Sequence, residues 1–381
     1  MQIIVKKFGG TSVGSISKIK NIATEISRHV HTCKQIIVVS AMSGETNRLL
    51  ALCSEISPTP TLQDQDMVAT TGEQVSTGLL SMALNSIGVS AIGLLGWQIP
   101  IITENNHANA RIHSINGDAL RQYLHQHDVV VISGFQGVTE NNRLTTLGRG
   151  GSDTSAVAIA VAVDAHECQI YTDVDGVYSA DPNQFATAHK IDRINSTIML
   201  EMASLGAKVL HVRSCELGFR HNLNISVLSS FDYNKKGTTV SNNYNMEEYP
   251  IISLNQSTNQ AYITINTSNN IIAKLYGIAN LDMLQSQTGS ISFACDKADV
   301  VLLEAYLTQY NYSYNTIPNL SKISLVGSGF RSNNKLNAQV WNIIHDFPII
   351  ATTYNEISIS FLVENINSAV LCNKLAVLLD K

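Results

Sequence analysis

The sequence lacks long apolar runs. No uninterrupted apolar stretch of the 381-residue chain approaches the roughly 18 residues that a membrane-spanning helix needs. The N-terminus begins with Ile3-Ile4-Val5, which is strand-like and unlike the apolar core of a signal peptide. Charged residues are few, at 14%, while 44% of the residues are hydrophobic, which excludes a disordered chain. We therefore expect a globular cytoplasmic protein of two or three domains, without a membrane partner.

Several binding signatures are also missing. The six cysteines show no CxxC spacing, so neither a zinc site nor a disulfide framework is predicted, and no set of metal ligands can be named. The net charge of −5 and the lack of a basic tract exclude a general attraction to nucleic acid. Neither a GxxxxGK[ST] P-loop nor a GxGxxG fingerprint occurs, which disfavours those two nucleotide folds. Any phosphate must therefore bind at a local site of another kind.

Residues 1–232 alternate between short apolar strands and helical patterns. Strands are expected at Gln2–Phe8, Gln35–Val39, Val89–Leu95, Val129–Ser133, Glu167–Tyr171 and Asn224–Leu228. Helices are expected at Ser17–His29, Asp66–Leu84, Asp118–Gln126, Ala156–Val163 and Ile198–Leu210. This alternation predicts an α/β fold with a mainly parallel sheet between layers of helices.

Polar, glycine-containing loops follow the first two strands. Gly9 and Gly10 let backbone N–H groups approach an anion closely, and Lys7 beside them supplies a positive charge. An ordinary tight turn with solvated lysines explains the same residues. The loop 40–47 follows the second strand, at the sheet edge where open α/β folds bind ligands.

Two further stretches suggest a site for a small charged molecule. Glu73 lies in an otherwise apolar helical pattern, where it either lies on an exposed face or binds a cation such as a substrate ammonium. The stretch 147–155 places an arginine, glycines and a Ser-Asp-Thr set ahead of a buried helix, which favours an anion at the helix start. A capped core helix with a glycine-rich turn is the alternative. The acidic stretch 172–182 is either a turn or a nucleotide-contacting loop.

A series of these motifs occurs in the order and approximate spacing found in aspartate kinases. The matching segments are Lys7–Val13, Ser40–Met42 with Thr46-Asn47, Gly72-Glu73, Gly134-Phe135, Leu147–Thr154, Thr172–Tyr178 and Gly206–His211. The chain therefore resembles aspartate kinase over essentially all of residues 1–232. The resemblance implies the amino-acid kinase fold and ATP-dependent phosphorylation of the L-aspartate β-carboxylate to 4-phospho-L-aspartate. That reaction is the first step towards lysine, threonine, methionine and diaminopimelate, and it implies ATP and Mg²⁺ as cofactors.

The resemblance also implies roles for individual residues. The catalytic residues would be Lys7, Asp153 and Lys208, with the lysines steadying the transferring phosphoryl group and Asp153 orienting them. The substrate-binding residues would be Thr46, Glu73, Phe135, Arg149, Gly150 and Ser152. The ATP-binding residues would be Lys7, Phe8, Gly9, Gly10, Ser40, Thr172, Asp173, Tyr178, Asp181 and Lys208. These residue types fit phosphoryl transfer, which depends on positioning and on cationic stabilisation, and the acceptor carboxylate is already ionised at neutral pH.

The C-terminal third reads as a smaller α+β region. A polar linker is expected at 233–249, and residues 250–381 resemble the tandem ACT region of aspartate kinase, which implies a homodimer or larger homo-oligomer. The usual Pro-Gly effector loop is missing before Ile271, so weak or absent feedback inhibition is expected. Asn183 also departs from the family, which usually has arginine there, and this predicts weaker binding of the nucleotide phosphates.

Two alternatives remain open at this stage. One is another member of the amino-acid kinase family, although Glu73 and the ACT-like tail favour aspartate over glutamate or a nucleotide as the acceptor. The other is a non-catalytic amino-acid-binding regulator that retains the fold. The joint presence of Lys7, Asp153 and Lys208 favours an enzyme, because a sensor has no need of two phosphate-facing lysines.

Overall fold

The chain forms two compact units. The computed structural model describes residues 1–207, 209–244, 251–267 and 270–379. The first unit comprises Met1–Val177, Lys190–Ala203 and the described residues of 208–244, and the second comprises Tyr178–His189, Ser204–Ala207 and the described residues of 245–381. The expected continuous unit 1–232 is thus interrupted twice. Residues 178–189 belong to the second unit because the apolar side chains of Ala180, Phe185 and Ala188 pack into one of its cores.

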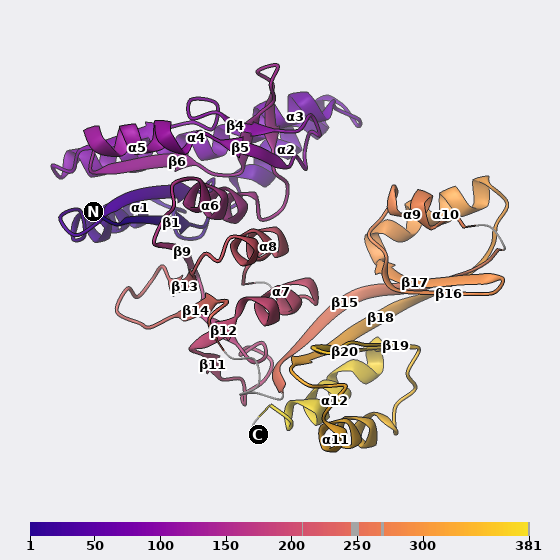
Figure 1. Cartoon of the computed structure of the whole chain (residues 1–381). Coiled ribbons are helices and arrows are strands. Elements are labelled where there is room, and N and C mark those ends of the chain that lie inside the picture. Colours follow the sequence, from indigo (N-terminus) through magenta and orange to yellow (C-terminus); the bar gives the residue numbers. More distant parts are fainter. Residues whose placement is uncertain (208, 245–250, 268–269, 380–381) are drawn as a thin grey trace. The chain divides into compact units, whose positions relative to one another are not determined.

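An eight-stranded sheet forms the centre of the first unit, in the order β12-β14-β13-β9-β1-β2-β6-β3 (Figure 1). Its strands are β1 (Ile3–Phe8), β2 (Lys34–Val39), β3 (Ala91–Leu94), β6 (Val129–Ser133), β9 (Glu167–Thr172), β12 (Arg193–Asn195), β13 (Ile225–Ser229) and β14 (Thr238–Ser241). Neighbouring strands are parallel except for β13 and β14, which run antiparallel. The predicted α/β fold with a mainly parallel sheet is confirmed. The segment expected to be a linker instead contains strand β14. Its Val240 is buried, which explains why this stretch belongs to the sheet.

Helices cover both faces of this sheet. They are α1 (Ile16–Ser27), α2 (Glu45–Ile56), α3 (Leu62–Ala69), α4 (Thr71–Ser86), α5 (Gly117–Gln126), α6 (Gly151–Ala162), α7 (Ser196–Ser204) and α8 (Val212–Arg220). Phe8 points into a core shared with α1 and α4. Because side chains alternate along a strand, its neighbour Lys7 points to the opposite face, where α6 lies against β1.

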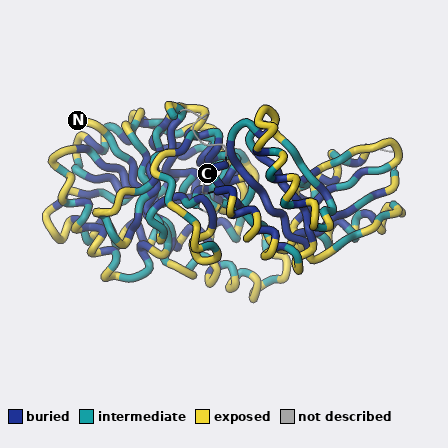
Figure 2. The backbone as a smooth tube through the Cα atoms, turned by 90° about the horizontal axis from the view of Figure 1, so that it is seen from below, coloured by how far each residue is buried: buried dark blue, intermediate teal, exposed yellow. Residues whose placement is uncertain are grey.

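Smaller strands complete the first unit. A four-stranded sheet in the order β5-β4-β7-β8 is formed by β4 (Ile101–Thr103), β5 (Ile112–Ile115), β7 (Gln136–Val138) and β8 (Leu144–Thr146). Two further short strands, β10 (Val177–Tyr178) and β11 (Lys190–Ile191), lie where the chain leaves the first unit and where it returns to it. The backbone tube in Figure 2 shows buried segments running through the interior of each unit and exposed segments on the loops around them.

Two expected helices differ from the observed ones. The single helix expected at 66–84 is two helices, α3 and α4, which meet at Thr70. The apolar spacing runs through this junction, so the sequence pattern could not reveal it. The helix expected at 198–210 ends at Ser204, because Gly206 adopts a left-handed backbone with φ of 107° that does not continue an α-helix.

The second unit is a six-stranded antiparallel sheet in the order β16-β17-β15-β18-β20-β19. Its elements are β15 (Ile251–Asn266), α9 (Ile272–Tyr276), β16 (Asp282–Gln287), β17 (Ser290–Asp296), α10 (Lys297–Gln309), β18 (Ser313–Gly327), α11 (Asn334–Ile344), β19 (Ala351–Tyr354), β20 (Ser358–Glu364) and α12 (Asn365–Ala376). Helices α9 and α10 pack at one end of the long strands and α11 and α12 at the other, each pair over its own core (Figure 1). The predicted α+β character is confirmed. Strand β16 was missed because its residues are largely polar and exposed.

The cysteines and the helix lengths bear on two of the features that the sequence lacks. All six cysteines are free, and all except Cys53 are buried. Within the described residues, no helix combines the length and the apolar character that a membrane span requires.

Candidate active site

The polar loops picked out in the sequence meet at one edge of the parallel sheet. In the strand register, Phe8 lies beside Val39 and Tyr171, and Val39 lies beside Ser133. The loops that follow β1, β2, β6 and β9 therefore emerge side by side. This is the carboxyl edge of the strands, where ligands bind in open α/β sheets.

A lysine–aspartate pair joins β1 to α6 at this edge. Lys7 Nζ lies 2.7 Å from Asp153 Oδ1, and the two side chains are only 12% and 13% exposed. Their low exposure reduces screening by solvent, so each charge fixes the position of the other. The pair leaves the ammonium of Lys7 directed at the glycine loop, since a β-carbon on Gly9 would lie 3.3 Å from Nζ.

The glycine loop after β1 is held closely against the loop after β2. A β-carbon on Gly10 would lie 2.8 Å from the backbone oxygen of Ala41, so no larger residue fits without a backbone shift. The Ser43 N–H donates to the Gly10 carbonyl at 3.1 Å, and the Ser40 N–H donates to the Phe8 carbonyl at 3.1 Å. The two loops thus form one rigid rim beside Lys7.

Helix α6 begins at this rim without a side-chain cap. Its N-cap residue Gly150 has a left-handed backbone with φ of 66° and supplies no side-chain capping hydrogen bond. The positive end of the helix dipole and its free N–H groups are therefore available to an anion. Ser152 in this turn packs on the loop after β6, since a β-carbon on Gly134 would lie 2.8 Å from its Oγ.

Glu73 is a buried carboxylate with only half of its bonding capacity used. Its side chain is 3% exposed, and Oε1 accepts a hydrogen bond from the Ala41 N–H at 2.9 Å. Within the described part of the chain, Oε2 has no hydrogen-bond partner. Burial raises the pKa of Glu73 to about 7, and the bond from Ala41 opposes this rise only partly. A cation placed at Oε2 would restore the ionised form.

Phe135 holds the loop after β6 in an unusual conformation. Its φ of 68° is uncommon for a residue other than glycine. The backbone is fixed by two hydrogen bonds, one donated by its N–H to Ser155 Oγ at 3.1 Å and one accepted by its carbonyl from the Leu147 N–H at 2.9 Å. The ring packs on the first residue of α6, Gly151. A strained backbone held by its surroundings is typical of functional sites.

Two further predicted substrate residues are the exposed Arg149 and the half-buried Thr46. Arg149 is exposed between Gly148 and Gly150, both left-handed, and it forms no ion pair or side-chain hydrogen bond with the described residues. Thr46 is the second residue of α2, whose first residue, Glu45, packs against Gly72 next to Glu73. The roles of these two residues in substrate binding stay predictions.

The predicted nucleotide residues are only partly brought together. Gly9, Gly10, Ser40 and Thr172 lie at the carboxyl edge, and the Thr172 hydroxyl donates to the exposed Asp173 at 3.1 Å. The ring of Phe8 instead stacks on Tyr171 in the core, with ring centres 4.6 Å apart. Phe8 can therefore contribute to this site only through its backbone.

Three remaining predictions cannot be placed with this group. Tyr178 and Asp181 belong to the second unit. The Asp181 carboxylate is engaged in a local turn, where it accepts hydrogen bonds from the backbone and side chain of Asn183 and from Gln184. Lys208 lies outside the described residues.

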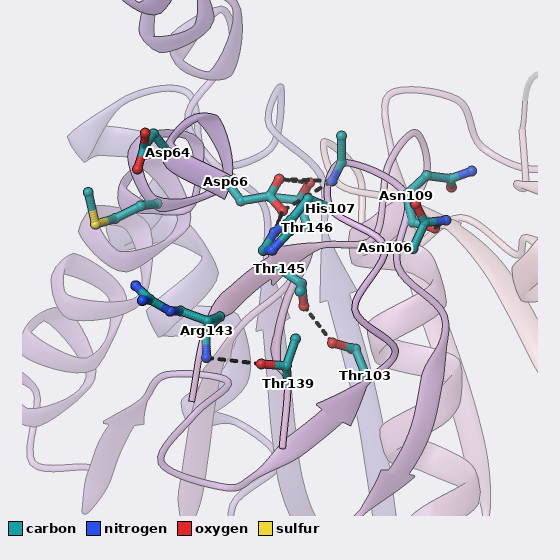
Figure 3. Close-up of polar contacts among 12 residues, drawn as sticks. Asp64, Asp66, Thr103, Asn106, His107, Asn109, Thr139, Arg143, Thr145 and Thr146 are labelled. Carbon is teal, nitrogen blue, oxygen red and sulfur yellow. Dashed lines mark hydrogen bonds and ion pairs between the residues drawn. The ribbon is translucent and has the colours of Figure 1, made fainter. Parts of the chain in front are cut away.

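The sequence pattern did not reveal a polar network beneath the loop of Arg149. Figure 3 shows the Asp66 side chain of α3 pointing towards His107 and Thr146. Asp66 is 2% exposed, and its oxygens lie 2.7 Å from His107 Nδ1, 2.6 Å from the Thr146 hydroxyl and 3.1 Å from the Ala108 N–H. Because Thr146 ends β8 just before the loop, this network fixes the strand from which Arg149 departs.

His211 is a second residue whose position the sequence did not reveal. Its ring fills the space beside Gly150, where a β-carbon would lie 2.2 Å from the ring. Burial lowers the pKa of His211, while the nearby charge of Asp153 acts in the opposite direction. The only sequence signal was its place at the end of the Gly206–His211 motif.

At one sheet edge of this α/β protein lie a lysine–aspartate ion pair, a glycine rim and a buried carboxylate whose Oε2 has no partner among the described residues. The family model of the amino acid kinase family matches residues 2–229 of this chain. An aspartokinase of Geobacillus stearothermophilus is 39% identical, with 96% of this chain and 94% of that protein covered. An aspartokinase of Rickettsia felis is 46% identical over 70% of this chain and 67% of that protein.

Solved structures match over the whole chain. Escherichia coli aspartokinase III in complex with aspartate and ADP superposes with a TM-score of 0.87 at 24% identity, and both chains are fully covered. The same enzyme in complex with lysine and aspartate gives a TM-score of 0.79 at 25% identity, again with full coverage of both chains. The chain belongs to the aspartokinases of the amino acid kinase family.

Proposed function

We propose that this protein is an aspartate kinase, which transfers the γ-phosphoryl group of ATP to the β-carboxylate of L-aspartate. The observation that carries the proposal is Glu73, a buried carboxylate whose Oε2 has no partner among the described residues. An unpaired buried charge is unfavourable, and an amino acid supplies the missing cation as its ammonium group.

The substrate would be held at both ends of its backbone. Its ammonium would bind Glu73, and its α-carboxylate would bind the exposed guanidinium of Arg149 through a bidentate contact. Ser152, Thr46 and the backbone around Phe135 would add hydrogen bonds. This arrangement directs the β-carboxylate towards the glycine rim and Lys7.

Transfer would then proceed with little acid–base chemistry. A β-carboxylate oxygen attacks the γ-phosphorus, the bond to the bridging oxygen breaks, and ADP leaves. The ammonium of Lys7, held by Asp153 at 2.7 Å, stabilises the charge on the transferring group, and Gly9 and Gly10 allow the backbone to approach it. We propose that Lys208 supplies the second cation.

The nucleotide would approach from the ends of β1 and β9. Thr172 and Asp173 would meet it there. Tyr178 and Asp181 stay proposed ATP-binding residues on the strength of the sequence resemblance alone. Among the described residues, no cluster of three or more His, Cys, Asp or Glu side chains could hold a metal ion. Mg²⁺ would therefore be held mainly by the ATP phosphates and water, which is how this ion usually binds.

The organisation of the chain leads to further proposals. We propose residues 1–232 as the catalytic region, 233–249 as a connection and 250–381 as a tandem ACT-like region that forms a homodimer or larger assembly. Residues 238–241 of that connection form β14, a strand of the eight-stranded sheet. The protein would act in the cytoplasm, in the pathway to lysine and threonine, with weak or absent feedback inhibition.

An ATP-dependent hydroxamate assay tests the proposed activity, because hydroxylamine traps acyl phosphates. Product with aspartate, and little with glutamate or without substrate, is the expected result. Equal product with glutamate would indicate another amino-acid kinase, and no product with either substrate would indicate a non-catalytic regulator.

A further inference from the structure

A pocket lies in the first unit, on the side of α6 away from the Lys7 contact. It measures about 510 Å³ and is formed by the edge strand β5 and the helices α6 and α8. From α6, its wall is made of Thr154, Ala158, Val161 and Ala162. Their spacing places them on one helical stripe. A volume of this size accommodates a small organic molecule.

The pocket combines an apolar floor with an excess of positive charge. Its charged lining residues are three arginines, Arg111, Arg213 and Arg220, and one glutamate, Glu216. Two histidines, His113 and His221, also line it. This local excess of cations contrasts with the net charge of −5 of the whole chain.

Among the described residues, two of the three arginines form no ion pair with a carboxylate. Glu216 is occupied by Arg220, at 2.5 Å, and across the described ranges neither Arg111 nor Arg213 forms an ion pair. Glu104 accepts a hydrogen bond from the backbone of Arg111 and not from its guanidinium. Burial and, secondly, the charge of Arg111 lower the pKa of Arg213. An anion between these two guanidinium groups would relieve their repulsion.

Arg213 also connects this pocket to the loop that carries Arg149. Its guanidinium donates hydrogen bonds to the carbonyls of Leu147 and Ala110, and to Asn109 Oδ1 at 3.3 Å. Leu147 is separated from Arg149 only by Gly148. These acceptors are neutral, so a carboxylate or phosphate in the pocket would compete for Arg213 through stronger, charge-assisted bonds.

We propose that this pocket binds a small organic anion, with a carboxylate or phosphate group on an apolar body, and that the ligand acts on the Arg149 loop through Arg213. The anionic group lies between Arg111 and Arg213, and the apolar body lies on Ala158, Val161 and Leu217. Binding draws Arg213 away from Leu147, loosens the loop and weakens aspartate binding. This second part rests on the proposed function, whereas the binding itself does not.

Phenyl phosphate and benzoate are suitable probes, with benzyl alcohol and inorganic phosphate as controls that lack one half of the ligand. Calorimetric titration of the full chain should give saturable binding of one or both aromatic anions and much weaker binding of the controls. Arg111→Gln and Val161→Trp should each weaken binding at least about tenfold, as expected for loss of one charged contact or of the pocket volume. Arg143→Gln is the matched control, because Arg143 is exposed and lies outside the pocket.

Each outcome of the titration decides the proposal. Absence of saturable binding, or equal binding by wild type and both pocket variants, would overturn it. A change in the sedimentation of Arg111→Gln without probe binding would assign the pocket to a contact between copies and would also overturn it. Comparison of the two aromatic anions shows whether phosphate or carboxylate is preferred.

Kinetics test the link to the loop. At saturating ATP, the bound anion should raise the KM for aspartate about fivefold, a typical coupling between two sites, and Arg111→Gln should abolish this effect. An increase of the ATP KM instead would indicate competition at the nucleotide site and would refute the link. If the enzyme proves inactive on aspartate, the titration still decides whether the site exists.

Discussion

Lys7 Nζ lies 2.7 Å from Asp153 Oδ1, and this contact joins the first strand of the sheet to the first turn of α6 across 146 positions of the sequence. The contact brings the glycine rim and the substrate loop into one site. Its functional value can be measured because both partners can be changed separately and together.

The first prediction concerns this pair. Lys7→Ala should lower kcat about 100-fold or more, since it removes a cation that stabilises the transferring phosphoryl group. Asp153→Asn should also lower kcat, and the double variant should lose little more than Lys7→Ala alone, because both act as one unit. Lys34→Ala, which breaks the more exposed pair with Asp128, should leave kcat unchanged. If the fold-loss in kcat of the double variant equals the product of the two single fold-losses, Lys7 and Asp153 act independently.

A second prediction follows from the raised pKa of Glu73, at about 7. The folded apoprotein retains a proton that the unfolded chain loses near pH 4.5, so this group reduces stability as the pH rises from there through 7. Glu73→Gln should therefore match wild type near pH 5 and exceed it at pH 8 by up to about 3 kcal/mol in urea unfolding. A difference in unfolding free energy between the two proteins that does not change with pH would contradict the raised pKa of Glu73.

The same substitution should impair substrate binding. In the wild-type protein the aspartate KM should fall as the pH rises through 7, because ionised Glu73 binds the ammonium. In Glu73→Gln the KM should be higher and nearly independent of pH. Glu140→Gln, at an exposed position, serves as the control for both measurements.

Arg149 provides a third prediction, which separates substrate from nucleotide binding. Arg149→Lys removes the planar bidentate group and should raise the aspartate KM at least about tenfold, with the ATP KM within about twofold of wild type. Arg143→Lys is the matched exposed control. Steady-state kinetics with each substrate varied in turn give both constants, and equal rises would remove Arg149 from the substrate site.

Glycine positions allow a fourth prediction. Gly10→Ala places a β-carbon 2.8 Å from the Ala41 carbonyl and should weaken ATP binding by shifting the rim. Gly78 lies in α4, and a β-carbon there would point into open space, so Gly78→Ala should stabilise the helix by about 0.5–1 kcal/mol and leave kinetics unchanged. Normal ATP binding by Gly10→Ala would show that the ATP site does not depend on the close packing of Gly10 against Ala41.

The fifth prediction concerns regulation. Because the usual Pro-Gly effector loop is missing from the sequence before Ile271, thermal-shift titration with lysine, threonine or methionine should give no saturable stabilisation. Aspartate with ADP is the positive control. A saturable rise in Tm with any of the three would show that the C-terminal region binds an effector.

The sequence was informative where chemistry and local pattern coincide. The strand–glycine–helix order after Phe8 predicted a parallel sheet with polar loops at one edge, and the strand register places those loops together. For Glu73 the apolar helical pattern left two possibilities, an exposed face or a cation partner, and its 3% exposure excludes the first. In both cases the physical constraint acts within a few residues of the chain.

Long-range contacts could not be predicted in this way. Asp66 bonds to Thr146 across 80 positions, and nothing in the local pattern around either residue indicates the other. The stretch 178–189 reads as a loop of the catalytic region, yet its apolar side chains pack in the second unit. Strand β16 is stabilised by pairing with β17, although its own residues carry little strand signal.

The two interruptions of the first unit matter for anyone who wishes to separate it. The chain leaves that unit at Tyr178, returns at Lys190, leaves again at Ser204 and contributes its last strand, β14, after residue 237. A truncation after residue 232 would therefore remove β14 from the sheet and would strip Ala180 and Phe185 of their apolar partners. No single cut therefore separates the whole first unit from the second, and we expect the first unit to require the full chain in order to fold intact.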